Sequence, residues 1–184
     1  MKLYRQTVED FGLYPGLEMT EAEYRELLEA ASKMSARMRA VRIVSATGVS
    51  KADLEHRLIQ KGEDPQQALE AVRWMQELDL LDDLKTAQQI VSRCISRGYG
   101  LQRAKQALYE KRIPKSYWDQ VLQDYPDQLD VICDYLRQHL TADSDEKQRR
   151  KAIDALIRRG HSYSQIRRGL SGLSLDADEF PEDE

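Results

Sequence analysis

Residues 91–108 read VSRCISRGYGLQRAKQAL, and the same layout returns in two other stretches of the chain. They are residues 41–58 (VRIVSATGVSKADLEHRL) and residues 153–170 (IDALIRRGHSYSQIRRGL). In each stretch a glycine (Gly48, Gly98 or Gly160) separates two apolar pairs whose members are three or four residues apart. Residues at these spacings share one helix face, so each stretch predicts a helix, a capping glycine turn and a second helix.

The apolar pairs define the expected core of each repeat. Before the glycines stand Val41 and Val44, Val91 and Cys94, and Ile153 and Leu156; after them stand Leu54 and Leu58, Ala104 and Leu108, and Ile166 and Leu170. Ser50, Gly100 and Ser162 are acceptable N-caps for the second helices. A third helix is expected after Asp64–Pro65 and from Pro114, because Pro favours the first helical turn. The third repeat lacks such a helix.

The repeats divide the chain into five expected parts. They are an N-terminal extension with one helix (1–35), three-helix repeats at 36–81 and 82–125, a linking helix with an incomplete third repeat (126–171), and an acidic disordered tail (172–184). In the extension, a capping box at Thr20 and Glu23 starts a helix that we expect to end near Ser32. Residues 1–19 are expected to be irregular or to contain a short strand. The predicted fold is all-α, with tandem three-helix repeats in an elongated, curved modular array.

Charge is unevenly distributed along the 184 residues. The formal net charge is −4, but six of the 32 acids lie in the last nine residues, and without them the chain carries a slight positive excess. No apolar run approaches the roughly 18 to 20 residues that span a bilayer, and the N-terminus has no signal-peptide core. We therefore expect a cytoplasmic protein without a membrane partner.

The residues that usually carry catalysis or bind metal form no recognisable motif. His56, His139 and His161 are scattered, and no partner stands at ligand spacing. Cys94 and Cys133 lie on apolar helical patterns, as reduced buried thiols do. The turn at 98–100 lacks the preceding strand and the Lys of a phosphate-binding loop. No metal, cofactor or catalytic residue is predicted, and an enzyme is not expected.

The candidate binding residues are basic and lie mainly in the third repeat. Residues 148–170 hold seven cations against Asp154 alone: Arg149, Arg150, Lys151, Arg158, Arg159, Arg167 and Arg168. Arg97 and Arg103 extend this set into the second repeat, and Tyr99 and Tyr163 stand in the turns. The cations are either a solvated helix face or a docking patch for acidic protein or for phosphates. The tyrosines either cover a helix junction or stack on a partner.

Two groups of residues carry a family resemblance. The first comprises Leu80-Leu81-Asp82-Asp83, Ala87, Val91, Arg93 and Arg97-Gly98-Tyr99-Gly100; the second comprises Lys151, Leu156, Arg158-Arg159-Gly160, Ser164, Ile166 and Leu170. Both resemble the RecX family of recombination regulators, over roughly residues 36–171, although His161 stands where that family usually has Phe. The resemblance implies a monomeric regulator that binds the RecA recombinase filament, with filament-bound single-stranded DNA as a further partner. It also implies inhibition of the recombinase and ATPase activities of RecA.

A second function stays open at this point. Three-helix units with a basic second helix also resemble helix-turn-helix domains in outline, so the chain could be a helical nucleic-acid-binding module that acts directly on DNA. Against this, the second helix of the first repeat is not mainly basic, because Asp53 and Glu55 add acidic charge to it.

Overall fold

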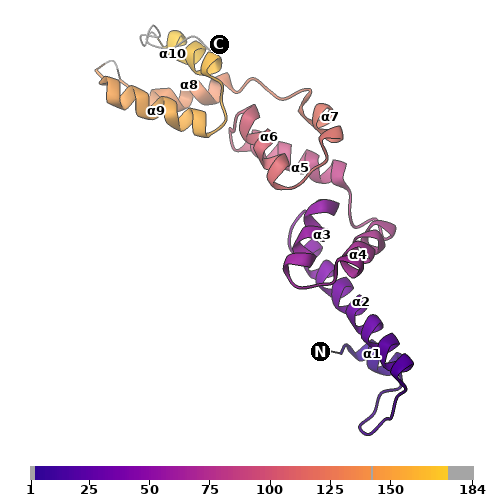
Figure 1. Cartoon of the computed structure of the whole chain (residues 1–184). Helices are drawn as coiled ribbons and strands as arrows, with labels where there is room; N and C mark the ends of the chain where they lie inside the picture. The colour runs from indigo at the N-terminus through magenta and orange to yellow at the C-terminus, as the bar shows by residue number, and fades with distance from the viewer. Residues whose placement is uncertain (1–2, 142, 174–184) are drawn as a thin grey trace. The chain divides into compact units, whose positions relative to one another are not determined.

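The computed structural model describes residues 3–141 and 143–173, and Figure 1 traces their elements in chain order. Helices make up 71% of this part of the chain, which contains no strand. The all-α prediction is therefore confirmed. The α-helices are α1 (Arg5–Asp10), α2 (Glu21–Ala46), α3 (Lys51–Gln60), α4 (Pro65–Glu77), α5 (Asp83–Ser96), α6 (Leu101–Glu110), α7 (Trp118–Leu122), α8 (Leu129–His139), α9 (Glu146–Arg158) and α10 (Tyr163–Gly172), and a 3-10 turn (Lys115–Tyr117) precedes α7.

The chain divides into two compact units. The first comprises residues 1–86 and 111–113, and the second comprises residues 87–110 and 114–184. The division falls inside α5, so it does not follow the repeats, and the repeat boundaries drawn from the sequence remain predictions. Among the described helices, none has both the length and the apolar character that crossing a membrane requires.

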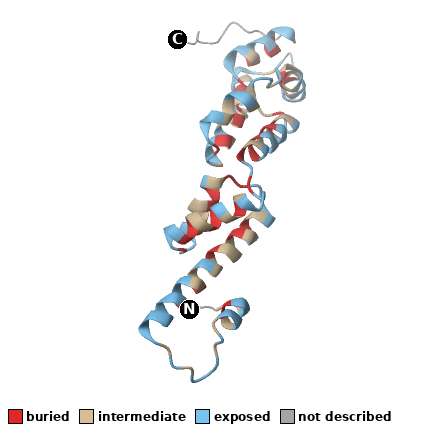
Figure 2. Cartoon of the chain, turned by 90° about the vertical axis from the view of Figure 1, so that its right-hand side faces the viewer, coloured by how far each residue is buried: buried red, intermediate tan, exposed pale blue. Residues whose placement is uncertain are grey.

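In the first unit, α2 packs against α3 and α4. Leu54 and Leu58, the apolar pair expected after the first glycine, are both completely buried. The other core residues of this unit are Ala36, Ala40, Ile43, Val49, Ala68, Ala71, Val72, Met75 and Leu81. Figure 2 shows that buried residues follow the sides of these helices that face one another. Burial of one stripe per helix is what the apolar spacing predicts.

In the second unit, α8 packs against α10 and α9. The core that these helices share consists of Ile132, Leu136, Leu140, Ala152, Ile153, Leu156, Ile166 and Leu170. Ala104 and Leu108 of α6 are also completely buried. The apolar pair after each of the three glycines is thus buried, as the repeat alignment predicts.

Polar caps begin several helices where the sequence places them. Thr20 and Glu23 form a complete capping box at the start of α2, and Ser162 and Gln165 form another at α10. The Asp64 side chain accepts hydrogen bonds from two backbone amides at the start of α4. These caps satisfy amides that have no partner within the helix, so each helix begins where its cap stands.

Two predictions for the N-terminal region are wrong. Residues 5–10 form helix α1, where irregular chain or a strand was expected; α1 packs on α2, a long-range contact that no local pattern announces. The helix that begins after Thr20 does not end near Ser32 but continues to Ala46. Residues 33–46 contain no Gly or Pro, and Ala, Met and Arg favour helix, so nothing interrupts it.

The glycine caps and the chain end also differ in part from prediction. Gly98 and Gly160 have positive φ angles of 65° and 89°, as capping glycines do, but Gly48 does not. There Thr47 ends the helix in an extended conformation, with φ −153° and ψ 145°. The predicted tail starts too early, because Gly172 belongs to α10 and Leu173 packs against the core. Residues 174–184 lie outside the described residues.

Candidate functional site

Five of the predicted binding residues line one surface hollow in the second unit. They are Arg97, Tyr99, Arg103, Arg158 and Arg159, and Tyr135 and Ala155 complete the lining. The hollow has a volume of about 530 Å³. Its walls are the turn after α5, the first turn of α6, α8, and the C-terminal end of α9. We call it the junction hollow, because residues of the second and third repeats meet there.

Backbone hydrogen bonds hold the two sides of the junction hollow together. The Gly100 amide donates to the Arg159 carbonyl at 2.9 Å, and the Gln102 amide donates to the Gly160 carbonyl at 3.2 Å. The start of α6 therefore meets the end of α9. Amides at a helix start and carbonyls at a helix end lack partners within their own helices and carry opposite partial charges. The contact satisfies both groups and sets where the arginines stand.

This contact requires glycine at two positions. A Cβ atom on Gly100 would lie 2.1 Å from the Gly160 carbonyl oxygen. A Cβ atom on Gly160 would lie 2.3 Å from the Arg103 backbone nitrogen, and the φ of Gly160 is +89°. The sequence interpretation assigned Gly100 only an N-cap role. The structure shows that its missing side chain lets the two turns approach each other.

His161 closes the same junction from inside. Its side chain is buried, and Nε2 lies 3.1 Å from the Gly98 carbonyl oxygen. A carbonyl only accepts, so Nε2 carries the proton, and Nδ1 has no hydrogen-bond partner among the described residues. Burial lowers the pKa of His161, and the nearby Arg159 lowers it further, although the hydrogen bond to Gly98 acts in the opposite direction. His161 is therefore neutral at pH 7.

The junction hollow is strongly positive. Arg103 pairs with Glu110 at 3.1 Å. Arg97 and Arg158 form no ion pair with any carboxylate of the described residues. Four guanidinium groups thus face one carboxylate, which leaves three positive charges in excess. Guanidinium groups bind carboxylates and phosphates through paired hydrogen bonds, so the hollow suits an anionic group of a partner.

Two tyrosines line the hollow, and they differ in the contacts that they make within the protein. The Tyr135 ring contacts Arg159, whose guanidinium carbon is 4.5 Å from the ring centroid, and His139, whose ring stacks on it at 4.0 Å. Two side chains of the protein thus already engage the Tyr135 ring. The backbone of Tyr99 is held by a hydrogen bond from the Tyr125 hydroxyl at 2.6 Å, and its half-buried ring lines the hollow. Tyr163 is 42% exposed and does not line the hollow.

The other predicted cations lie away from the hollow. Arg149, Arg150 and Lys151 are in the first turns of α9, about 10–14 Å along the helix axis from Arg158, and Arg167 lies on α10. The structure therefore does not gather the whole basic interval of the third repeat at one place.

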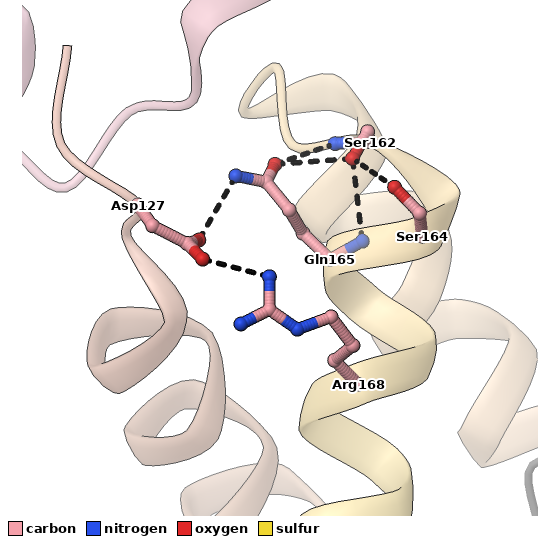
Figure 3. A network of polar contacts seen from close by, with 5 residues as sticks. All are labelled: Asp127, Ser162, Ser164, Gln165 and Arg168. Atoms are coloured by element: carbon pink, nitrogen blue, oxygen red, sulfur yellow. Dashed lines mark hydrogen bonds and ion pairs between the residues drawn. The ribbon is translucent and has the colours of Figure 1, made fainter. Parts of the chain in front are cut away.

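Arg168 is engaged within the protein. Its Nη1 donates to Asp127 Oδ2 at 2.7 Å, and Gln165 Nε2 donates to Asp127 Oδ1 at 3.1 Å (Figure 3). Gln165 also completes the α10 cap with Ser162, so the cap and the ion pair form one network. Asp127 lies 41 residues before Arg168 in the sequence, so counting charges over residues 148–170 missed this carboxylate.

Sequence reasoning also missed a second basic hollow, in the first unit. Its cations are Arg39, Arg42, Arg57 and Lys61, from α2, α3 and the residue after α3. Arg39 and Arg42 are three residues apart, and Arg57 and Lys61 are four apart, so each pair shares a helix face. That spacing was available in the sequence, but only packing shows that the two pairs line one surface.

The described residues show no cluster of three or more His, Cys, Asp or Glu side chains that could hold a metal ion. Cys94 is buried and Cys133 is half-buried, and both are free. Burial raises the pKa of the Cys94 thiol, although Arg103, Arg97 and Arg93 act in the opposite direction. Cys94 therefore stays protonated at neutral pH and is not a reactive thiolate.

The chain is similar to curated proteins and solved structures that carry the name RecX, although no family model matches it. It is 27% identical over 145 residues to the regulatory protein RecX of Vibrio parahaemolyticus and 26% identical over 145 residues to that of Vibrio campbellii. Each match covers 77% of this chain and 93% of the relative. A crystal structure of regulatory protein RecX superposes with a TM-score of 0.64 at 19% identity, over 90% of this chain and 86% of that one. RecX from Lactobacillus salivarius gives a TM-score of 0.65 at 20% identity, over 79% of this chain and 98% of that one. This chain is therefore similar in sequence to proteins named regulatory protein RecX, and it shares the fold of the RecX crystal structures.

Proposed function

We propose that this protein is a cytoplasmic regulator that binds RecA and its DNA-bound filament and inhibits the recombinase and ATPase activities of RecA. It would act as a monomer, by binding rather than by catalysis. Sequence similarity to relatives named regulatory protein RecX supports RecA regulation in general. The observation that carries the proposal is the junction hollow, where five of the predicted binding residues line one surface.

The chemistry of the junction hollow fits a filament partner. A RecA filament assembled on DNA presents the carboxylates of acidic side chains and the phosphates of the DNA. Carboxylates and phosphates can both accept paired hydrogen bonds from Arg97 and Arg158. The two turns that form the hollow are joined by backbone hydrogen bonds, so the backbone positions that carry the arginines are set before a partner binds. Binding there would interfere with filament growth, ATP turnover and strand exchange.

The test is a titration of the protein into RecA on single-stranded DNA, with ATP hydrolysis and filament length as readouts. Arg97→Glu/Arg158→Glu reverses two unpaired cations of the hollow, and Arg150→Glu/Lys151→Glu reverses two predicted cations outside it. We expect the first pair to weaken inhibition about tenfold or more and the second much less, because charges beyond about 10 Å are largely screened. Equal losses, with unchanged thermal melts, would mean that the attraction is diffuse.

Direct binding to DNA is the second candidate, and one observation favours it. The Tyr99 ring lines the same hollow as four arginines, and proteins that hold single strands combine cations with aromatic rings. Binding of single-stranded DNA without RecA, as tight as binding to the filament and lost in Tyr99→Ala, would favour this function over the first.

A further inference from the structure

The second basic hollow lies between α2 and α3 in the first unit, and we call it the α2–α3 hollow. Four cations (Arg39, Arg42, Arg57 and Lys61) line its volume of about 320 Å³, together with Ile43, Ala46 and Thr47. It shares no lining residue with the junction hollow and lies in the other unit. Its role is therefore a separate question.

Buried carboxylates hold two of the four cations in place. Arg39 Nε donates to Glu63 Oε1 at 2.5 Å, and Ser35 Oγ donates to the same oxygen at 3.0 Å. Arg57 binds Asp53 through two nitrogens, Nε to Oδ1 at 3.1 Å and Nη2 to Oδ2 at 2.9 Å. The side chains of Glu63 and Asp53 are only 6% and 8% exposed. These contacts fix both guanidinium groups, and each keeps N–H donors that its carboxylate does not use.

The other two cations are exposed at the surface. Neither Arg42 nor Lys61 forms an ion pair within the part of the chain that the structure describes. Four cations and two carboxylates leave two positive charges in excess around the hollow. Since the carboxylates are buried and the free cations are exposed, the surface that a partner meets is positive.

We propose that the α2–α3 hollow binds an acidic segment of a protein partner, with carboxylates against the cations and a small apolar side chain against Ile43 and Ala46. Two of its arginines already hold carboxylates inside the protein, so their environment suits that group. Ile43 and Ala46 line the same hollow as the four cations and offer apolar contact. Among the described residues no aromatic ring lines this hollow, so they offer no surface on which a nucleic-acid base would stack. The inference goes beyond the proposed function, because it does not require the partner to be RecA.

The test uses the full chain and a fluorescent peptide in which glutamates flank one leucine, with a labelled oligothymidylate as the phosphate probe. Arg42→Glu/Lys61→Glu reverses the two unpaired cations and leaves the buried pairs intact. Arg73→Glu/Lys85→Glu is the matched control, because both residues are exposed cations of the first unit outside the hollow. At low salt we expect the first pair to weaken peptide binding about tenfold or more and the control less than about threefold.

Three further results decide the assignment. Arg42→Lys/Lys61→Arg keeps the charges and is expected to bind the peptide within about threefold of the parent. If the charge-reversed pair melts at a lower temperature, Arg42→Gln/Lys61→Gln replaces it and is expected to weaken binding in the same direction. Equal loss in the control pair would overturn the proposal, as would a larger loss for oligothymidylate than for peptide. RecA is absent from this assay, so its failure leaves the proposed function to be tested separately.

Discussion

Replacing Gly100 by alanine is expected to open the junction between the second and third repeats. The added Cβ atom would lie 2.1 Å from the Gly160 carbonyl oxygen and 2.5 Å from the His161 backbone nitrogen. Both neighbours are backbone atoms, which cannot rotate away as the end of a side chain can. The φ of Gly100 is not positive, so alanine itself suits this backbone, and the whole penalty comes from the tertiary contact.

The expected loss of stability follows from the contacts between the two turns that alanine would break or overpack. Separating them breaks the hydrogen bonds from the Gly100 and Gln102 amides, about 1 kcal/mol each. Keeping them together instead forces an overpacked contact that costs about 1–3 kcal/mol. We therefore expect the free energy of unfolding of the second unit to fall by about 2–3 kcal/mol. The arginines of the junction hollow would also move apart, so RecA inhibition should weaken.

The assay is urea unfolding followed by circular dichroism, together with hydrogen exchange of the Gln102 amide. Gly172→Ala is the control, because Gly172 ends α10 and, among the described residues, its added Cβ has no atom within 4 Å beyond its chain neighbours and its own helix backbone. The Gly172→Ala variant should be more stable than the parent by less than about 1 kcal/mol, since alanine favours helix. If Gly100→Ala unfolds at the urea concentration of the parent and the Gln102 amide keeps its protection, the reasoning about this junction is refuted.

The remaining predictions concern pH, the core and the α10 network. Because burial lowers the pKa of His161, the unfolded chain binds a proton more readily. The second unit should thus lose stability as pH falls below about 6.5, and His161→Phe should remove that part of the pH dependence in urea titrations. Leu58→Asp and Leu108→Asp should each cost about 4 kcal/mol or more, because both side chains are completely buried; a parent-like thermal melt in either would contradict the repeat alignment. Asp127→Asn should lower stability by less than about 1 kcal/mol, because its ion pair is exposed, but it frees Arg168 and should strengthen binding of acidic peptide to the second unit. Weaker peptide binding in that variant would contradict the role assigned to the pair.

Much of the helical architecture could be read from short stretches of sequence. The caps at Thr20, Asp64 and Ser162 and the buried pair Leu54 and Leu58 all involve residues within four positions of each other. A helix is stabilised by contacts of that range, so its start and its buried face leave a local pattern. The same reasoning missed α1, because its helical state depends on packing against α2.

The sequence by itself determined the helix caps, the apolar pairs that are buried and the identity of the basic residues, because cap residues and apolar spacing act locally. Only the tertiary structure decided which cations work together. The close approach of Gly100 and Gly160, 60 residues apart, places Arg97 and Arg158 in one hollow. Arg168 pairs with Asp127, 41 residues away in the sequence. The tertiary structure also combined α2 and α3 into a second hollow. Charges act through space rather than along the chain, so their neighbours are set by how the helices pack.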